Sequence, residues 1–230
     1  MKVRAFVTDV DGTMTENYPV IDLEAASVLK NLVKMGYKVV LASGRSIYEL
    51  YSLSMFLGLG KYAVGENGAI IVEGTAEKIK PLADNWYPLQ ALSYLEKDLP
   101  EVKVKSSLPR FTEVVLERVP EVERVRESLK KSGLPVRVLD SGYAYHIVNQ
   151  HVSKALGVKE LLNALSIKPD ETVAFGDSET DVSLFQLCGY SVAMANSDEE
   201  AKAHARHITN ASQGKGLIEA VDFVFAKLAD

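Results

Sequence analysis

Residues 5–13 read Ala5-Phe6-Val7-Thr8-Asp9-Val10-Asp11-Gly12-Thr13, and this is the most informative segment of the chain. An apolar run short enough to be a buried strand ends on two carboxylates one residue apart, which a glycine and a hydroxyl follow. Because the backbone turns at the end of a strand, Asp9 and Asp11 can both reach the carboxyl edge of a sheet, where open α/β sheets bind their ligands. Two crowded carboxylates repel each other, so the stretch predicts a hard divalent cation between them.

Two other interpretations of the same residues are simpler. Asp-Gly often marks only a tight turn, and an EF-hand loop also begins with acids two residues apart. An EF-hand loop, however, needs further oxygen ligands and a late glutamate, and it lies between helices. Here the segment follows a strand, and Gly12-Thr13-Met14 interrupts the ligand spacing. We therefore favour a functional site at the end of a strand.

Length and composition are those of an ordinary globular protein. The 230 residues suffice for one large domain or for a core with a smaller insert. A net charge of −5 and the lack of a basic stripe argue against binding to nucleic acid. No apolar stretch approaches the roughly 18 residues that cross a bilayer, and no signal peptide is visible. The single cysteine, Cys188, ends an apolar helix and is interpreted as a buried structural thiol. We expect a cytoplasmic protein without a membrane or nucleic-acid partner.

Strands and helices alternate at both ends of the chain. Apolar periodicity predicts helices and strands in turn over residues 22–35, 37–42, 46–57 and 62–64, after the opening strand. The same rhythm returns with a helix over 154–165, a strand over 172–175, a helix over 182–187, a strand over 191–194 and a final helix over about 217–228. This order predicts an α/β fold with a doubly wound parallel sheet, a Rossmann-like core covered on both faces.

The middle of the chain has a different pattern. Helices are predicted over 87–97 and 121–131, and strands over 102–104, 113–118, 136–139 and 143–148. Alternating strands and an Asp-Ser-Gly turn at 140–142 indicate an antiparallel sheet with helices on one face. The sequence therefore predicts a core domain made of residues 1–81 and 153–230, interrupted by an α+β cap domain over residues 82–152.

Three more segments place small or charged residues at strand or helix ends. Ser43 and Gly44 follow an apolar strand and precede a helix, which is an arrangement that can bind an anion. Asp177 and Asp181 lie between a strand and a helix, where Asp181 could also be a simple helix cap. Lys154 begins a helix, a position that disfavours a cation and therefore suggests a fixed anionic partner.

Taken together, these segments resemble the four motifs of the haloacid dehalogenase superfamily. Asp9-Val10-Asp11-Gly12-Thr13 is similar to the first motif, Ser43 to the second, Lys154 to the third, and the run from Gly176-Asp177 to Asp181 to the fourth. The mid-chain insert and Gly65-Glu66-Asn67-Gly68-Ala69 resemble the Cof-like phosphatases of that superfamily. The chain departs from the fourth motif at Thr180, where the family often has asparagine, so a contact of Thr180 with metal or phosphate is left out of the predicted site.

The resemblance implies a Mg²⁺-dependent phosphomonoesterase that acts through an aspartyl-phosphate. Asp9 would be the nucleophile, and Asp11 would be the general acid and then the general base. Mg²⁺ would be held by Asp9, by the backbone carbonyl of Asp11 and by Asp177, with Asp181 binding from the second shell or through water. The phosphoryl oxygens would be bound by Ser43, the Gly44 amide and Lys154.

The substrate follows from a narrower resemblance. Chain length, cap size and the run Ser141-Gly142-Tyr143-Ala144-Tyr145-His146 resemble the archaeal phosphoglycolate phosphatases, which implies 2-phosphoglycolate. Candidates for binding its acid group are Arg45, Arg110 and His146. Each has a simpler interpretation: Arg45 pairs with Glu49, Arg110 is an exposed loop charge, and His146 is a packed strand residue.

Other functions use the same apparatus. The alternatives are a broad-specificity sugar-phosphate phosphatase and a phosphomutase or phosphotransferase, in which a second hydroxyl replaces water. A receiver-type signalling switch also clusters acids, a hydroxyl and a lysine, but it would accept phosphate after a later strand and has no place for the insert. A phosphate-binding protein without activity is disfavoured because all the chemical residues are present. The expected partner is a small phosphorylated metabolite, and a homodimer is a hypothesis that no sequence feature carries.

Overall fold

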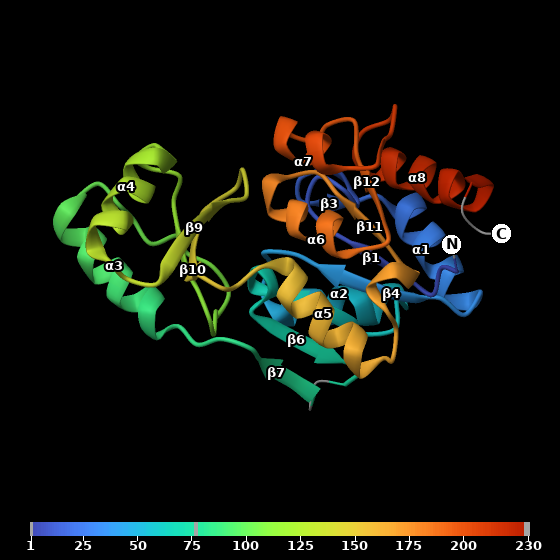
Figure 1. Ribbon diagram of the computed structural model, residues 1–230, viewed down its shortest axis with the longest axis horizontal. Coiled ribbons are helices and arrows are strands. Elements are labelled where there is room, and N and C mark those ends of the chain that lie inside the picture. Colours follow the sequence, from blue (N-terminus) through green and yellow to red (C-terminus); the bar gives the residue numbers. More distant parts are fainter. Residues whose placement is uncertain (1, 76–77, 228–230) are drawn as a thin grey trace.

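The protein is built around an eight-stranded sheet, seen on the right of Figure 1. The computed structural model describes residues 2–75 and 78–227. The strand order is β13-β12-β11-β1-β4-β5-β6-β7, and the strands from β13 to β5 are parallel. The last two strands, β6 and the edge strand β7, run antiparallel to their neighbours. The bounds are β1 Ala5–Thr8, β4 Lys38–Ala42, β5 Tyr62–Gly65, β6 Ile70–Glu73, β7 Ile79–Pro81, β11 Thr172–Gly176, β12 Tyr190–Ala193 and β13 His207–Ile208.

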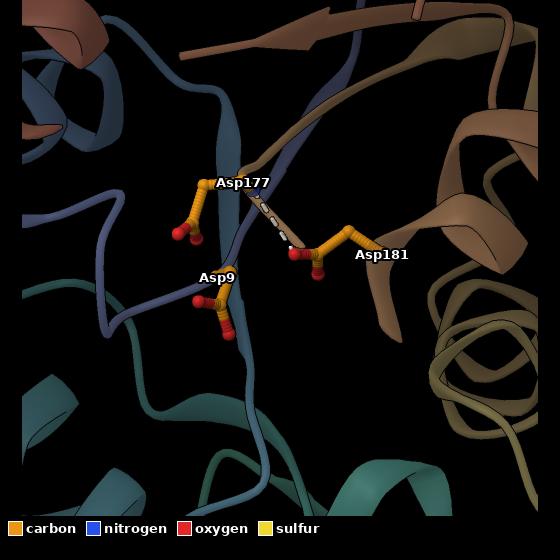
Figure 2. A group of neighbouring side chains, drawn as sticks. All are labelled: Asp9, Asp177 and Asp181. Atoms are coloured by element: carbon orange, nitrogen blue, oxygen red, sulfur yellow. Dashed lines mark hydrogen bonds between the residues drawn. The ribbon is translucent and has the colours of Figure 1, made fainter. Parts of the chain in front are cut away.

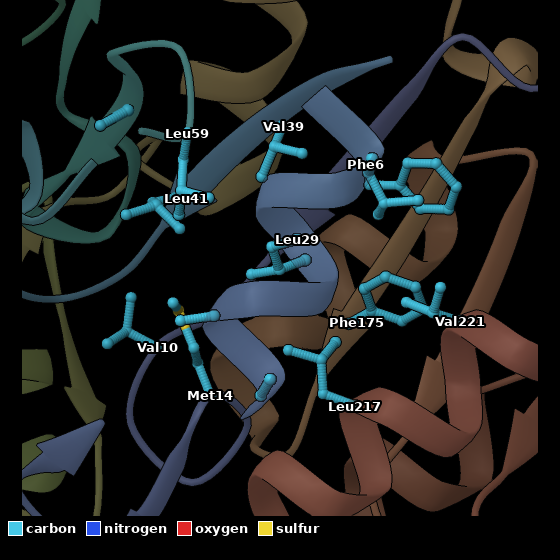
Figure 3. Close-up of a cluster of buried hydrophobic side chains, with 14 of the residues drawn as sticks. Phe6, Val10, Met14, Leu29, Val39, Leu41, Leu59, Phe175, Leu217 and Val221 are labelled. Atoms are coloured by element: carbon cyan, nitrogen blue, oxygen red, sulfur yellow. The ribbon is translucent and has the colours of Figure 1, made fainter. Parts of the chain in front are cut away.

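Helices cover both faces of this sheet, as the alternating pattern predicts. On one face, Phe6 and Phe175 pack against Leu29 of α1 and Val221 of α8 (Figure 3). On the other face, Val7 and its neighbours pack against α5 and α6. The doubly wound α/β fold is therefore confirmed. The helices are α1 Leu23–Lys34, α2 Ile47–Leu57, α5 Lys154–Ala164, α6 Val182–Leu187, α7 Glu199–His204 and α8 Gln213–Lys227. The predicted last residue of the final helix, 228, lies outside the described residues.

Side-chain caps determine where two of these helices begin. Asp22 precedes α1, and its Oδ1 accepts hydrogen bonds from the backbone N–H groups of Glu24 and Ala25 at 2.9 and 3.1 Å. Ser46 precedes α2 and forms a reciprocal capping box with Glu49. Each cap satisfies amide donors that have no partner inside the helix. Among the helices within residues 2–75 and 78–227, none is long and apolar enough to cross a bilayer.

A second, smaller sheet lies beside the first, on the left of Figure 1. It is antiparallel with the order β8-β10-β9, and its strands are β8 Val114–Leu116, β9 Val136–Asp140 and β10 Tyr145–Asn149. Helices α3 (Trp86–Asp98) and α4 (Val122–Ser132) pack on it and share an apolar cluster of their own. The predicted strand over 102–104 is wrong: Val104, 54% exposed, makes only an isolated bridge to Leu116. An exposed side chain gains nothing from packing, so little stabilises a longer strand there.

Several elements near the sheet edge were not predicted. A hairpin of β2 (Thr15–Asn17) and β3 (Val20–Ile21) follows β1 and carries Tyr18 at its turn. Between β5 and β6 lies the short helix η1 (Glu66–Gly68), in which Glu66 and Asn67 have φ values of +49° and +57°. Non-glycine residues rarely adopt this conformation, and such strain concentrates at functional sites. Two more short helices, η3 (Pro169–Glu171) and η4 (Glu179–Asp181), flank β11.

Candidate active site

The predicted residues meet at the carboxyl edge of the large sheet. Strand β1 lies between β4 and β11, so the residues that follow these three strands are neighbours in space. Asp9 follows β1, Ser43 follows β4 and Asp177 follows β11. One cavity is lined by six of the seven predicted residues, namely Asp9, Asp11, Ser43, Gly44, Lys154 and Asp177. The seventh, Asp181, is fully buried behind them.

Three carboxyl groups form a compact acidic cluster (Figure 2). One oxygen from each of Asp9, Asp177 and Asp181 lies within 4.8 Å of the others. Burial raises the pKa of Asp9 to about 7, against the opposing charge of Lys154. Burial, followed by the charges of Asp9 and Asp181, raises the pKa of Asp177 to about 8. Buried carboxyl groups with raised pKa values bind either a proton or a cation. Clustered carboxylate oxygens are also the ligands that Mg²⁺ prefers.

Lys154 is the buried cation of the cluster. It begins α5, where Ser153 caps the helix, and only 3% of the residue is exposed. Its Nζ donates hydrogen bonds to Oδ1 of Asp9 and to Oδ1 of Asp181, both at 2.7 Å. Burial alone would lower the pKa of Lys154, but the carboxylates of Asp181 and Asp9 outweigh it and hold the pKa above its ordinary value. The anionic partner that the helix-start position suggested is therefore present.

Asp181 orders the loop that carries Asp177. Its second oxygen, Oδ2, accepts hydrogen bonds from the backbone N–H groups of Asp177 and Ser178, both at 3.1 Å. With Oδ1 bound to Lys154, both oxygens of Asp181 are engaged inside the protein. Thr180 lines the cavity, but its hydroxyl pairs with the Ser178 hydroxyl at 2.8 Å. Asp181 therefore positions Lys154 and the loop that carries Asp177, and neither of its oxygens is free to bind a metal ion directly.

Two residues that the predicted site did not contain fix the Asp177 side chain. The Thr13 hydroxyl donates to Oδ1 of Asp177 at 3.0 Å. Asn196, from the loop after β12, donates from Nδ2 to Oδ2 of Asp177 at 3.4 Å and to the Gly12 carbonyl at 2.9 Å. Gly12 has φ of +83°, and a Cβ built on it would lie 2.1 Å from Oδ2 of Asp177. Thr13 lies in the segment 5–13, so its place beside Asp9 and Asp11 could have indicated a role in the site. No sequence feature indicated Asn196.

Asp11 is held by an arginine from the neighbouring loop. Arg45 Nε donates to Oδ2 of Asp11 at 2.8 Å, and Nη2 donates to Oδ1 at 2.7 Å. The third nitrogen, Nη1, pairs with Glu49 at 3.1 Å, so the simpler interpretation of Arg45 is also correct. This planar two-point contact fixes the Asp11 carboxylate at the cavity wall. Beside it, the Ser43 hydroxyl accepts the Arg45 backbone N–H at 3.3 Å.

The smaller sheet contributes a polar network to the opposite wall. Arg110 donates from Nη1 to the Gly44 carbonyl and, at 2.7 Å, to Glu113. Glu113 also accepts from Asn67 and pairs with His146 Nδ1, each at 3.0 Å. This network joins the loop after β4 to the loop before β8. Arg110 is therefore not a freely exposed loop charge, and His146 is buried among polar partners, 3% exposed.

The short helix η1 anchors the same loop. Glu66 accepts the backbone N–H groups of Phe111 and Thr112 at 3.0 and 2.8 Å and the Thr112 hydroxyl at 2.6 Å. Burial raises the pKa of Glu66, which the hydrogen bonds from Thr112 oppose. At the cavity mouth, the ring of Tyr18 from the β2–β3 hairpin lies 5.1 Å from the ring of Tyr143. The segment over residues 82–152 thus contacts both η1 and the β2–β3 hairpin.

Comparisons with known proteins agree on one family. The family model of haloacid dehalogenase-like hydrolases matches residues 6–132 and 96–221. The phosphoglycolate phosphatase of Nitrosopumilus maritimus is 39% identical over 224 residues, which are 96% of each chain. That of Methanothermobacter thermautotrophicus is 32% identical over 95% of this chain and 97% of its own.

Solved structures show the same fold. Protein 0175 of Thermoplasma acidophilum superposes with a TM-score of 0.84 at 28% identity, over 97% of this chain and 98% of that one. The sucrose-phosphatase of Synechocystis has a TM-score of 0.74 at 22% identity, over 97% of this chain and 98% of its own. At that identity the likeness concerns the fold alone.

Proposed function

The chain belongs to the haloacid dehalogenase-like hydrolases, and on this premise we propose that it hydrolyses 2-phosphoglycolate to glycolate and phosphate with Mg²⁺ as cofactor. It is a phosphoric monoester hydrolase. The curated relatives named phosphoglycolate phosphatase support this substrate. One observation carries the chemistry: Lys154 joins Asp9 and Asp181 at 2.7 Å beside Asp177, in a cavity at the carboxyl edge of the sheet.

The acidic cluster fits a divalent cation. With all three carboxylates ionised, the cluster and Lys154 together carry two unbalanced negative charges, which one Mg²⁺ would neutralise. Asp9 and Asp177 would hold the ion with the backbone carbonyl of Asp11, while Asp181 would act through its neighbours because both of its oxygens are engaged. The ion would offset the repulsion between the Asp9 carboxylate and an incoming phosphate dianion.

In the proposed first step, Asp9 attacks the phosphorus and the bond from phosphorus to the glycolate oxygen breaks. Asp9 is 4% exposed, and Lys154 fixes one of its oxygens, so the nucleophile is held in one orientation. For this step Asp11 must first take up a proton from solvent, which loosens its two-point contact with Arg45, and it then gives that proton to the leaving alkoxide. Its carboxyl group lines the cavity next to Asp9, where Arg45 fixes its plane. The products of this step are glycolate and an aspartyl-phosphate on Asp9.

In the second step, Asp11 takes a proton from water, and the resulting hydroxide attacks the aspartyl-phosphate. The phosphorus-to-Asp9 bond breaks, phosphate leaves and Asp9 is restored. Ser43, the Gly44 amide and Lys154 would bind the phosphoryl oxygens in both steps, since all three line the cavity. We propose that residues 82–152 form the cap that covers the cavity and that residues 1–81 and 153–230 form the core.

Phosphate release from a panel of phosphomonoesters tests the proposal. The panel contains 2-phosphoglycolate, sugar phosphates and nucleoside monophosphates, each assayed with Mg²⁺ and with EDTA. Asp9→Asn should abolish release because it removes the nucleophile, whereas Asp222→Asn, an exposed position on α8, should retain it. Release that is fastest on 2-phosphoglycolate and lost in EDTA would support both mechanism and substrate.

Other outcomes separate the parts of the proposal. Faster release from a sugar phosphate would retain the mechanism and reject the substrate. Phosphate transfer to an added sugar, without release to water, would indicate a phosphotransferase. Full activity of Asp9→Asn would reject the aspartyl-phosphate mechanism.

A further inference from the structure

We propose that Arg110 binds the second anionic group of the substrate, the carboxylate next to the ester carbon, and that Glu113 positions it for this contact. The inference rests on the proposed function and extends it to a specificity residue. It names the substrate class as phosphomonoesters of short hydroxy acids.

Arg110 lies next to the predicted phosphate site. Its Nη1 donates to the carbonyl of Gly44, the residue whose amide is expected to bind a phosphoryl oxygen. It also lines the cavity that contains Asp9. Arg110 therefore lies in the same cavity as the proposed nucleophile and contacts the loop that is expected to bind phosphate, where it can meet an anionic group close to the ester.

The guanidinium has a free edge. All its hydrogen bonds to described residues pass through Nη1, which contacts Gly44 and Glu113. Nε is buried without a hydrogen-bond partner among the described residues, and Nη2 donates to none of them. Nε and Nη2 together form the edge with which arginine can bind a carboxylate at two points. Nε has almost no exposed surface, so we assign the substrate contact to Nη2 of this cavity-lining side chain. The unmet Nε shows that no described residue completes this edge.

Glu113 holds this edge in place. Its side chain is fully buried, and it contacts Arg110 at 2.7 Å, His146 at 3.0 Å and Asn67 at 3.0 Å. The charges of His146 and Arg110 lower the pKa of Glu113 against the effect of burial, which keeps the carboxylate ionised. A buried carboxylate with three donors restricts Arg110 to one orientation before substrate arrives. Glu66 adds to this restriction by anchoring the backbone that follows Arg110.

The other two candidate cations are already engaged. Arg45 uses its Nε–Nη2 edge on Asp11 and its Nη1 on Glu49. His146 has Nδ1 on Glu113 and Nε2 on the Ser141 hydroxyl at 3.2 Å. A substrate carboxylate could bind either one only by displacing a partner. Of the three, Arg110 alone keeps a donor edge that no described residue occupies.

Two esters that differ only at the second anionic group test the inference. One is 2-phosphoglycolate, and the other is 2-hydroxyethyl phosphate, in which CH₂OH replaces the carboxylate. For Arg110→Met, we expect kcat/KM on 2-phosphoglycolate to fall about 10- to 100-fold, mainly through KM, as expected for a lost charge-assisted contact. On 2-hydroxyethyl phosphate the fall should stay below about 3-fold. Arg110→Lys should give an intermediate ratio, and Glu113→Gln a smaller shift in the same direction. Arg118→Met removes another cap arginine, which is paired with Asp140, and should leave the ratio unchanged.

Binding gives the same ratio without turnover. Each ester is titrated into the Asp9→Asn protein in Mg²⁺ buffer, and then into the same protein that also carries Arg110→Lys. The ratio of the dissociation constants of the two esters is compared between the two proteins. Equal losses for both esters would overturn the inference, because that result indicates a structural or general phosphate-loop role. An unchanged preference in the Arg110 variants would overturn it while the proposed function stands. A preference in binding that depends on Arg110, together with a wild-type protein that releases no phosphate from either ester, would support the inference and reject the proposed function.

Discussion

Replacing Lys154 by methionine should destabilise the protein strongly, and divalent metal should restore part of the loss. Lys154 is the only cation in direct hydrogen-bond contact with the acidic cluster among the described residues. Methionine keeps much of the length and the apolar stem of the side chain but removes its charge. The substitution therefore leaves Asp9 and Asp181 buried without their shared partner, while the packing of α5 changes little.

The size of the effect follows from the geometry. At 2.7 Å and an effective dielectric constant of about 20, each contact of Nζ with a carboxylate oxygen is worth about 6 kcal/mol of gross attraction. Desolvation of the ammonium group opposes this attraction by several kcal/mol. Breaking a buried ion pair by removing one partner typically costs about 3–5 kcal/mol, and we expect Lys154→Met to lose about that much free energy of unfolding.

Urea denaturation with EDTA and with Mg²⁺ measures this prediction. For a loss of about 3–5 kcal/mol, the melting temperature should fall by roughly 6–20 °C and the urea midpoint by about 1–2 M. Mg²⁺ should stabilise the variant more than the wild type because the variant has lost its internal counter-charge. Lys159→Met, at an exposed position of the same helix, is the matched control. A Lys154→Met variant within about 1 kcal/mol of this control in EDTA would refute the electrostatic account of the cluster.

Two further substitutions, each with a comparison variant, test how the residues around the site shape it. Gly12→Ala places a Cβ 2.1 Å from Oδ2 of Asp177, so we expect at least about 100-fold loss of Mg²⁺-dependent phosphate release. Gly142→Ala has a similar positive φ of +73° but no atom within 4 Å, and should retain activity with a loss of about 1 kcal/mol in a thermal melt. Glu66→Gln replaces one acceptor oxygen by an NH₂ group, so hydrogen exchange at the Thr112 amide should become about 10- to 100-fold faster; unchanged exchange would contradict the anchoring role. Thr112→Val removes only the hydroxyl bond and should have the smaller effect on the neighbouring amides.

The core and the residues at its edge could be predicted because the signals are local. A buried strand reads as an apolar run, and the next residue must lie at the carboxyl edge of the sheet. Asp9, Ser43 and Asp177 each follow such a run, so the sequence indicates their common edge without a structure. The right order of strands and helices then brings them together, since parallel strands joined by helices have few alternative arrangements.

The contacts between η1 and the loop before β8 could not be predicted because they join residues far apart in the chain. Asn67 and Glu113 are separated by 46 positions, and Glu66 and Thr112 by the same number. The turn that presents these residues needs positive φ at both Glu66 and Asn67; Asn67 tolerates this conformation, but Glu66 rarely adopts it, so local propensity does not indicate the strain at Glu66. Such a turn persists only where its surroundings stabilise it, and here they do so through the bonds to the opposite loop.

The same limit explains why the sequence left three candidates for binding the acid group of the substrate. Arg45, Arg110 and His146 are all chemically able to bind a carboxylate, and spacing along the chain says nothing about which donors remain free. The deciding property is whether a side chain already has hydrogen-bond partners. Arg45 is bonded to Asp11 and Glu49, and both ring nitrogens of His146 have partners. In the proposed function, specificity for a small acid would therefore depend on one unoccupied guanidinium edge, which the buried carboxylate of Glu113 holds in place. A survey of charged residues would give these side chains equal weight, whereas counting their hydrogen-bond donors separates them.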